Sequence, residues 1–235
     1  FADRTFSVVN GLTFAVYGGM GVVFFLMSLQ LQVTAGWSPL QAGTAMLPVT
    51  LIMLLLSSRS GDLATRIGAR LPLTVGPIGV ALGMLLMTRI GPDASFVADV
   101  LPATIVFGLG LALIVAPLTT TALGAVPDER VGSASGVNNA VARTAGLLSV
   151  AAIPGLVGLT GDALSDPARL GPGFERAMVV SAVIVGLAGL VAFALLPRSS
   201  VSAERCTRHD KLIIHRPCPV DGAGSSVEPA VAAGR

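Results

Sequence analysis

The sequence is poor in charged and aromatic residues, in cysteine and in histidine. Of its 235 residues, 12% are charged and 5% are aromatic, and it has two cysteines and two histidines. Both cysteines, Cys206 and Cys218, lie near the C-terminal end, so no disulfide framework holds the rest of the chain together. The net charge of +2 is too small for a nucleic-acid-binding surface. Both histidines lie outside the apolar segments, which argues against a membrane enzyme.

Apolar residues dominate what remains. They make up 53% of the chain, more than a soluble domain of this length tolerates. A helix that crosses a bilayer needs roughly 20 mostly apolar residues. The sequence therefore predicts an all-α integral membrane protein with six transmembrane helices in residues 1–197. The expected helices are Val8–Val33, Pro39–Ser58, Leu71–Ile90, Phe96–Leu123, Gly132–Leu159 and Phe174–Leu196. Glycine pairs such as Gly79 with Gly83 and Gly132 with Gly136 predict close helix packing.

Basic residues predict the orientation, because cytoplasmic loops carry an excess of Lys and Arg. With six crossings, one side receives Arg4, Arg59, Arg66, Arg70, Arg130 and the segment after Arg198. The other side receives Arg89, Arg169 and Arg176. We therefore expect both ends of the chain in the cytoplasm.

The C-terminal segment 198–235 is rich in Ser, Arg, Pro, Gly and Ala, and this composition predicts a disordered cytoplasmic tail. Its one possible metal pattern is formed by Cys206, His209, His215 and Cys218. Two thiolates and two imidazoles can bind zinc. Their spacing matches no zinc module known to us, and we expect neither a metal nor another cofactor.

The stretch GDLATRIGAR, Gly61–Arg70, concentrates charge in an expected cytoplasmic turn. One interpretation is an ordinary short inner loop. The stretch also resembles the loop signature of the major facilitator superfamily, in which Gly, Asp, Arg, Gly and two bases follow one another at fixed spacing. Gly61, Arg66, Gly68 and Arg70 match it, whereas Thr65 replaces the Asp and Ala69 the first closing base. The resemblance implies a conformational latch, weakened by Thr65.

Other stretches resemble the C-terminal half of the fourteen-helix drug and proton antiporter branch. They include FFLMSLQLQ with GWSPLQAGTAMLP, and PLTTTALGAVPDERVGSASGVNNAVARTAGLLSVA. The resemblance covers Phe1 to about Arg198. It implies that the chain is one six-helix half of a transporter whose N-terminal half is absent from this sequence. It also implies location in the bacterial plasma membrane.

Polar side chains within the expected spans are the candidate substrate-cavity residues. Asn10, Thr13, Tyr17 and Phe24 share one face of the first span, and the resemblance implies that this span lines the transport pathway. Ordinary hydrogen bonds between helices are the alternative.

Arg143 lies near the middle of the fifth span and shares a face with Ser135 and Asn139. An unpaired Arg at that depth costs about 2.5–3.5 kcal/mol, so it needs a partner. It either binds an anionic group or forms a fixed pair between the two halves. We expect any acidic partner to lie in the absent half.

The resemblance implies a secondary active transporter that exports drug-like or amphipathic molecules in exchange for protons. The expected partners are the lipid bilayer, the missing half, a small-molecule substrate and protons, with no nucleic acid. The alternatives are a carrier of an anionic metabolite from another branch and a transport-inactive half that serves as an assembly partner.

Overall fold

The computed structural model describes residues 3–196, apart from the side chains of residues 62 and 65–67. The chain divides into two units, Phe1–Ser202 and Ala203–Arg235. All described residues belong to the first unit. The expected tail 198–235 and its four candidate zinc ligands lie outside the described residues.

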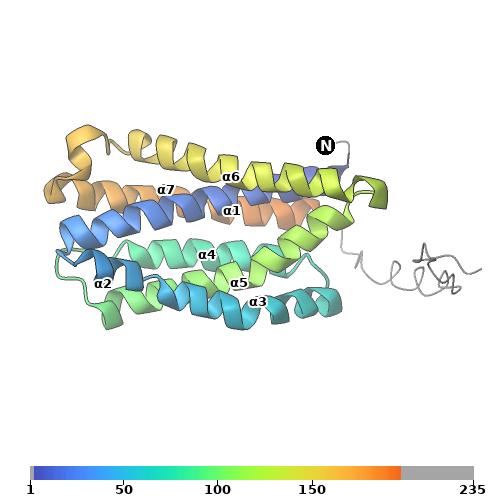
Figure 1. Ribbon diagram of the computed structural model, residues 1–235, viewed down its shortest axis with the longest axis horizontal. Coiled ribbons are helices and arrows are strands. Elements are labelled where there is room, and N and C mark those ends of the chain that lie inside the picture. Colours follow the sequence, from blue (N-terminus) through green and yellow to red (C-terminus); the bar gives the residue numbers. More distant parts are fainter. Residues whose placement is uncertain (1–2, 197–235) are drawn as a thin grey trace, which may run out of the picture. The chain divides into compact units, whose positions relative to one another are not determined.

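The described residues form a bundle of helices (Figure 1). Seven α-helices are present between residues 3 and 196: α1 (Arg4–Leu29), α2 (Pro39–Thr44), α3 (Leu47–Ile67), α4 (Pro72–Met87), α5 (Leu101–Gly124), α6 (Val131–Leu156) and α7 (Pro167–Leu195). A π-helical turn, Gln30–Thr34, extends α1, and another, Phe96–Val100, precedes α5. Taking α2 and α3 together as one span, the prediction of six helical spans is confirmed.

The helices differ in how apolar they are. Four segments are long and apolar enough to cross a membrane: Arg4–Thr34, Pro39–Gly61, Phe96–Gly124 and Pro167–Leu195. The helix α4 is apolar but shorter. The helix α6 has 26 residues but is less apolar than these, because polar side chains recur along it. It is therefore the span least suited to lipid on every side.

The second span is not the single helix Pro39–Ser58 that the sequence predicted. It is divided at Ala45 and Met46 into α2 and α3. The cause is Pro48, whose ring would collide with the carbonyl of Thr44 in a continuous helix and whose nitrogen has no hydrogen to donate. A capping box between Ser38 and Gln41 fixes the start of α2.

The expected turn Gly61–Arg70 is also corrected, because α3 continues to Ile67. The connection consists of Gly68 and the three residues that follow it. Gly68 has φ of +85°, a left-handed conformation that favours glycine and ends the helix. Most of the stretch that resembles the loop signature is therefore the last two turns of a helix.

The last connection is shorter than predicted. The sequence suggested a loop from Gly161 to Gly173, but α7 begins at Pro167. The Asp166 side chain accepts a hydrogen bond from the Ala168 amide, with N–O 3.0 Å. Proline is favoured at a first helical position, where its missing N–H has no helical partner to lose. The span expected from Phe174 thus starts seven residues earlier.

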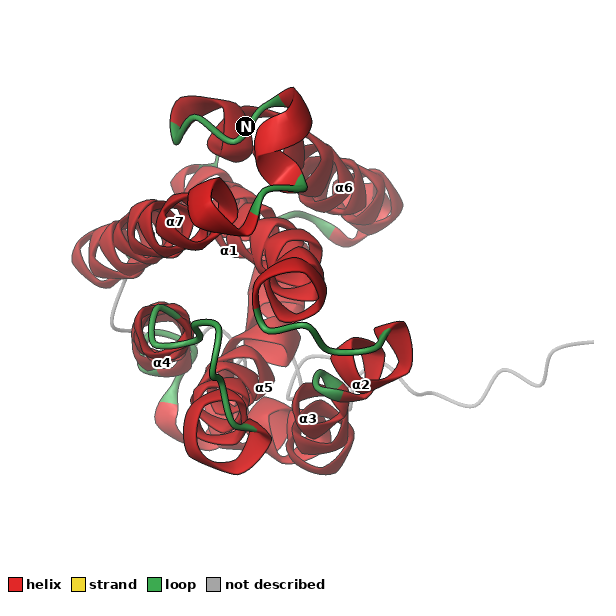
Figure 2. Cartoon of the chain, turned by 90° about the vertical axis from the view of Figure 1, so that its left-hand side faces the viewer, coloured by secondary structure: helices red, strands yellow, loops and turns green. Residues whose placement is uncertain are grey.

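The helices pack in two groups, one formed by α1, α6 and α7 and the other by α3, α4 and α5 (Figure 2). In the first group α1 contacts both α6 and α7, and in the second α5 contacts both α3 and α4. The groups meet through α4 against α7 and α1 against α5. Exchanging α1, α3 and α4 with α5, α6 and α7 leaves this contact pattern unchanged. The bundle therefore consists of two three-helix repeats, one formed by α1, α3 and α4 and the other by α5, α6 and α7. The first helix of each repeat packs against the other two helices of the opposite repeat.

Glycines permit the closest helix contact, that between α4 and α5. A Cβ built on Gly83 would lie 2.6 Å from the Cα of Phe107, and one on Gly110 would lie 2.8 Å from the carbonyl carbon of Gly79. Both distances are too short for real atoms, so only glycine fits at these positions. The predicted packing role of Gly79 and Gly83 is confirmed.

Candidate functional site

The polar face of α1 is buried at its N-terminal end. Asn10 donates from Nδ2 to the Phe6 carbonyl over 2.8 Å, and its Oδ1 has no hydrogen-bond partner among the described residues. The Thr13 hydroxyl lies 2.9 Å from the Val9 carbonyl and 3.0 Å from Oδ1 of Asn138 on α6. Asn10 and Thr13 therefore lie within the bundle, and Thr13 links α1 to α6.

The same face becomes more open toward the other end of α1. Tyr17 is half-buried, and Phe24 is 42% exposed. The four predicted cavity residues on α1 thus share a face, but only the side chains of Tyr17 and Phe24 are partly exposed on the surface of the bundle. Their role in a substrate cavity stays a prediction.

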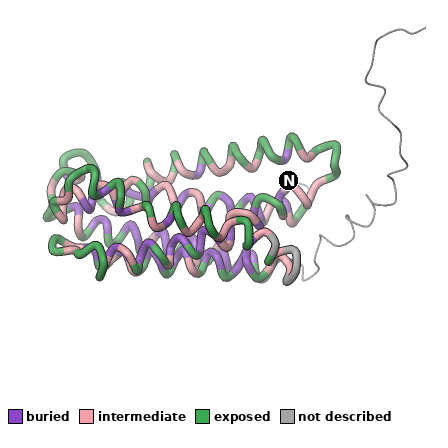
Figure 3. The backbone as a smooth tube through the Cα atoms, turned by 60° about the horizontal axis from the view of Figure 1, so that its bottom comes forward, coloured by how far each residue is buried: buried purple, intermediate pink, exposed green. Residues whose placement is uncertain are grey.

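The helix α6 presents most of its surface outside the bundle, as the green and pink stretches in Figure 3 show. Ser135, Asn139 and Arg143 are exposed and follow one another at four-residue spacing. Arg143 is the thirteenth of 26 residues in α6. Within the described part of the chain, it makes no ion pair. The three side chains form a polar face on α6, which we call the α6 polar face.

Sequence reasoning missed Asn138, which contacts α1 instead of lying on the α6 polar face. It lies on the side of α6 that also carries the buried residues Ala134 and Ala145. The signal was its register, since residues four and seven positions apart along a helix share a face. A polar side chain among buried small ones indicates a hydrogen bond to a neighbouring helix.

Two glycines in the first half of α6 have no neighbour in the described bundle. A Cβ on Gly132 or Gly136 would meet no atom within 4 Å among the described residues. The close packing that the sequence predicted for this pair is therefore absent from the described bundle. By contrast, a Cβ on Gly21 of α1 would lie 3.1 Å from the Cα of Gly146, where α1 and α6 cross closely.

Arg70, a predicted latch residue, binds the C-terminal end of α7. Its Nε and Nη2 donate to the Phe193 carbonyl over 2.9 and 2.6 Å, and its guanidinium carbon lies 4.1 Å from the centre of the Phe193 ring. The last carbonyls of a helix lack intrahelical donors and carry partial negative charge, so a guanidinium is stabilising there. Gly61 lies within α3, Gly68 ends it, and the Arg66 side chain is outside the described residues.

These features define a class of protein: a multi-pass α-helical membrane protein in which one helix presents an exposed polar face. The sequence model of the Major Facilitator Superfamily matches residues 2–150. The chain belongs to this family of membrane transporters.

Several relatives carry names that refer to drug resistance or export. The chain is 32% identical to multidrug resistance protein Stp of Mycobacterium tuberculosis, over 83% of this chain and 34% of that protein. It is 30% identical to puromycin resistance protein pur8 of Streptomyces alboniger, over 80% of this chain and 38% of the relative. It is also 30% identical to cephamycin export protein CmcT of Amycolatopsis lactamdurans, over 74% and 36%. The chain therefore spans little more than a third of the length of each of these relatives.

Proposed function

We propose that the chain forms the C-terminal half of a secondary active transporter that exports drug-like or amphipathic small molecules in exchange for protons. The observation that carries this proposal is the α6 polar face. Ser135, Asn139 and Arg143 are exposed and run from the second turn of α6 to its middle, where Arg143 is the thirteenth of 26 residues. Polar side chains at that depth are unfavourable against lipid and usually face protein or an aqueous cavity. An opposing half provides both.

The glycines on α6 support the same arrangement. Gly132 and Gly136 lie one turn apart and are open, and small residues at this spacing allow another helix to approach closely. We propose that a helix of the other half packs near them. The substrate cavity then lies between the two halves, with Tyr17, Phe24, Asn139 and Arg143 on its wall. Thr13 contributes by holding α1 against α6, whereas the hydrogen bond of Asn10 lies within α1.

The direction and coupling of transport are inferred from the relatives' names and from the resemblance to drug and proton antiporters. We propose that the transporter lies in a bacterial plasma membrane with both ends of this chain in the cytoplasm. Rocking of the two halves about a site near the bilayer midplane gives access from alternate sides. In this scheme Arg70 does not contact the other half. It supports the latch by holding the turn after α3 against α7.

A transport assay on a complete carrier that contains this chain tests the proposal. We expect cells that express it to accumulate less ethidium, and we expect a protonophore to abolish the difference. Arg143→Ala lowers export about tenfold or more if the loss of one charge contact exceeds about 1.4 kcal/mol. Arg89→Ala is the matched control, because Arg89 is an exposed base at the end of α4.

Export that is indifferent to the proton gradient contradicts the coupling. The purified 235-residue chain in vesicles should not transport ethidium, because it supplies one wall of the cavity. Transport by that chain alone contradicts the half-carrier proposal.

One observation favours a second candidate, a carrier of an anionic metabolite. Arg143 is an exposed cation, and a guanidinium binds carboxylates and phosphates well. Under this alternative, Arg143→Ala abolishes uptake of a carboxylate or phosphate ester, and the carrier leaves ethidium accumulation unchanged.

A further inference from the structure

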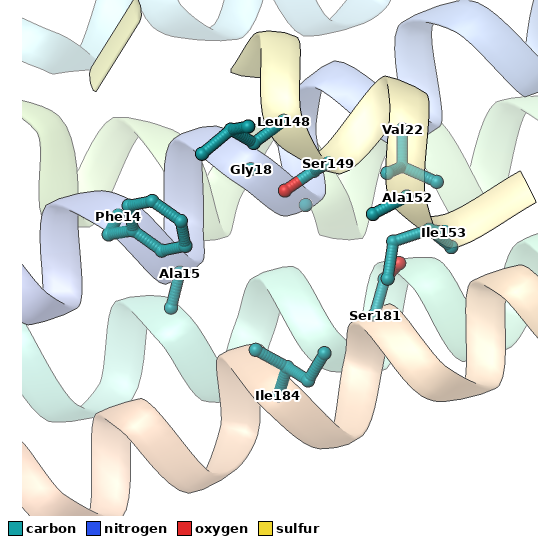
Figure 4. Close-up of a pocket in the computed structure, with 11 residues that line it drawn as sticks. Phe14, Ala15, Gly18, Val22, Leu148, Ser149, Ala152, Ile153, Ser181 and Ile184 are labelled. Carbon is teal, nitrogen blue, oxygen red and sulfur yellow. The ribbon is translucent and has the colours of Figure 1, made fainter. Parts of the chain in front are cut away.

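A cavity of about 210 Å³ lies between α1, α6 and α7. Figure 4 shows its walls: Phe14 and Gly18 come from α1, Ser149 and Ala152 from α6, and Ser181 and Ile184 from α7. The cavity is distinct from the α6 polar face, since neither Asn139 nor Arg143 lines it.

Small residues create this space. On α1 the wall includes Ala15, Gly18 and Gly19, and on α6 it includes Ala152. A larger residue does not fit at Gly18, because a Cβ there would overlap the side chain of Ser149. The helices α6 and α7 contact each other little and are held together mainly through α1.

In the group formed by α3, α4 and α5, the contacts that correspond to the walls of the cavity are close. There α5 takes the place of α1, and α3 and α4 take the places of α6 and α7. A Cβ on Gly108 of α5 would lie 3.1 Å from the Cα of Val49 on α3. A Cβ on Gly83 of α4 would lie 2.6 Å from the Cα of Phe107 on α5.

The mouth of the cavity is apolar. Phe14, Leu148 and Ile184 line it and are 43%, 53% and 45% exposed. Ile184 also belongs to a larger exposed apolar surface of α7, which comprises Val179, Val183, Ile184, Leu187, Leu190 and Val191. In a membrane protein such a surface faces hydrocarbon. The cavity residues on α1 lie about 130° around the helix from the Asn10, Thr13 and Tyr17 face, at 3.6 residues per turn.

One polar atom in the wall has no partner. Ser181 is 2% exposed, and its Oγ makes no hydrogen bond with any described residue. A buried hydroxyl in this state is unfavourable, because it has lost water and gained nothing in return. A ligand with one hydrogen-bond donor or acceptor would satisfy it.

We propose that this cavity binds small lipophilic molecules that carry a single hydrogen-bonding group, typified by a phenol, and that enter from the bilayer. The ring fills the apolar space, and its hydroxyl pairs with the Ser181 hydroxyl, which turns to another rotamer to meet it because its oxygen is covered in the ligand-free structure. The size is suitable, since a dry apolar cavity of about 150 Å³ is enough to bind benzene. The site does not depend on the proposed transport function, because all of its walls belong to this chain.

Photolabelling of the full chain in lipid nanodiscs tests the proposal. The probe is an aryl diazirine with a phenolic hydroxyl, and the matched probe lacks the hydroxyl. We expect saturable labelling of peptides from α1, α6 and α7 by the phenolic probe, with competition by excess 4-propylphenol. Ser181→Ala lowers the apparent affinity for the phenolic probe about three- to tenfold, the effect of one net hydrogen bond. The hydroxyl-free probe is unaffected by this change.

A pair of substitutions on α6 tests the location. Ala152→Leu adds bulk inside the cavity and abolishes saturable labelling. Ala151→Leu is the matched control, since Ala151 is the exposed neighbour that does not line the cavity, and it leaves labelling intact. Equal labelling of these two variants overturns the site. If labelling by both probes never saturates, lipid chains of the bilayer occupy the cavity, and this result also overturns the proposal. A phenol affinity unchanged by Ser181→Ala overturns the role of that hydroxyl.

Discussion

Arg70 joins the turn before α4 to the last turn of α7 through three contacts of one side chain. Two of them are hydrogen bonds to the Phe193 carbonyl, and the third is stacking on the Phe193 ring. We expect Arg70→Ala to destabilise the bundle by about 1–2 kcal/mol, because it removes charge-assisted hydrogen bonds and a cation–π contact. Thermal unfolding of the purified chain in detergent measures the effect.

Two further variants separate the contributions of Arg70. Arg89→Ala removes an exposed base at the end of α4 and should leave the unfolding midpoint unchanged. Phe193→Leu keeps the carbonyl and removes the ring, so its loss should be smaller than that of Arg70→Ala. Equal midpoints for Arg70→Ala and Arg89→Ala would show that the contacts to α7 contribute nothing.

At single residues, sequence reasoning identified chemistry better than partners. It placed Arg70 in a turn and Arg143 near the middle of a span, and in the structure Arg70 lies in the turn before α4 and Arg143 is the thirteenth of 26 residues in α6. It did not identify Phe193 as the partner of Arg70, because that contact joins residues 123 positions apart. A single sequence carries helical register but no signal for pairings at that separation.

The helices α4 and α6 provide a test of what their glycines do. We expect Gly83→Ala to destabilise the bundle by about 1–3 kcal/mol, because the new methyl group would meet the Phe107 backbone, which cannot move aside. Gly136→Ala has the same chemistry in an open helical position. It should be neutral or stabilising by up to about 1 kcal/mol, since alanine favours a helix over glycine. Chemical or thermal unfolding compares the two, and a similar loss for both would contradict close packing of α4 on α5.

The length and apolar pattern of the helices were enough to predict six spans. The predicted bounds were wrong where individual residues, such as a proline or polar side chains, determine where a helix begins or ends. The break between α2 and α3 follows from Pro48, which the sequence shows plainly. The extension of α3 to Ile67 is harder to see, because its last turns are polar and contain Gly61. Apolar periodicity ends before such a helix does, since the pattern reports burial and not backbone conformation.

In the bundle as a whole, the two repeats share one contact pattern but differ in their surfaces. The helix α6 takes the position that α3 takes in the other repeat. The exposed side of α3 carries Leu47, Leu51, Leu54 and Leu55. The exposed surface of α6 carries Ser135, Asn139 and Arg143 in its first half, and Leu147, Leu148 and Leu156 in its second half. The apolar surface is suited to lipid or to an apolar partner, and the polar one to water or a polar partner. Two helices with equivalent contacts therefore have different environments.

The distribution of bases predicts the orientation of the bundle. The start of α1, the end of α3 and the start of α6 lie at one end of it (Figure 1), and this end carries Arg4, Arg59, Arg70 and Arg130. Because basic ends remain in the cytoplasm, Glu129→Cys should resist a membrane-impermeant maleimide in intact cells, whereas Asp93→Cys and Asp162→Cys should react. All three positions are exposed. The variants carry Ser in place of Cys206 and Cys218, and permeabilised cells, in which every variant should react, provide the control. Reaction at Glu129→Cys in intact cells, with protection at the other two, would reverse the orientation and place the Arg70 contact with α7 on the outer side.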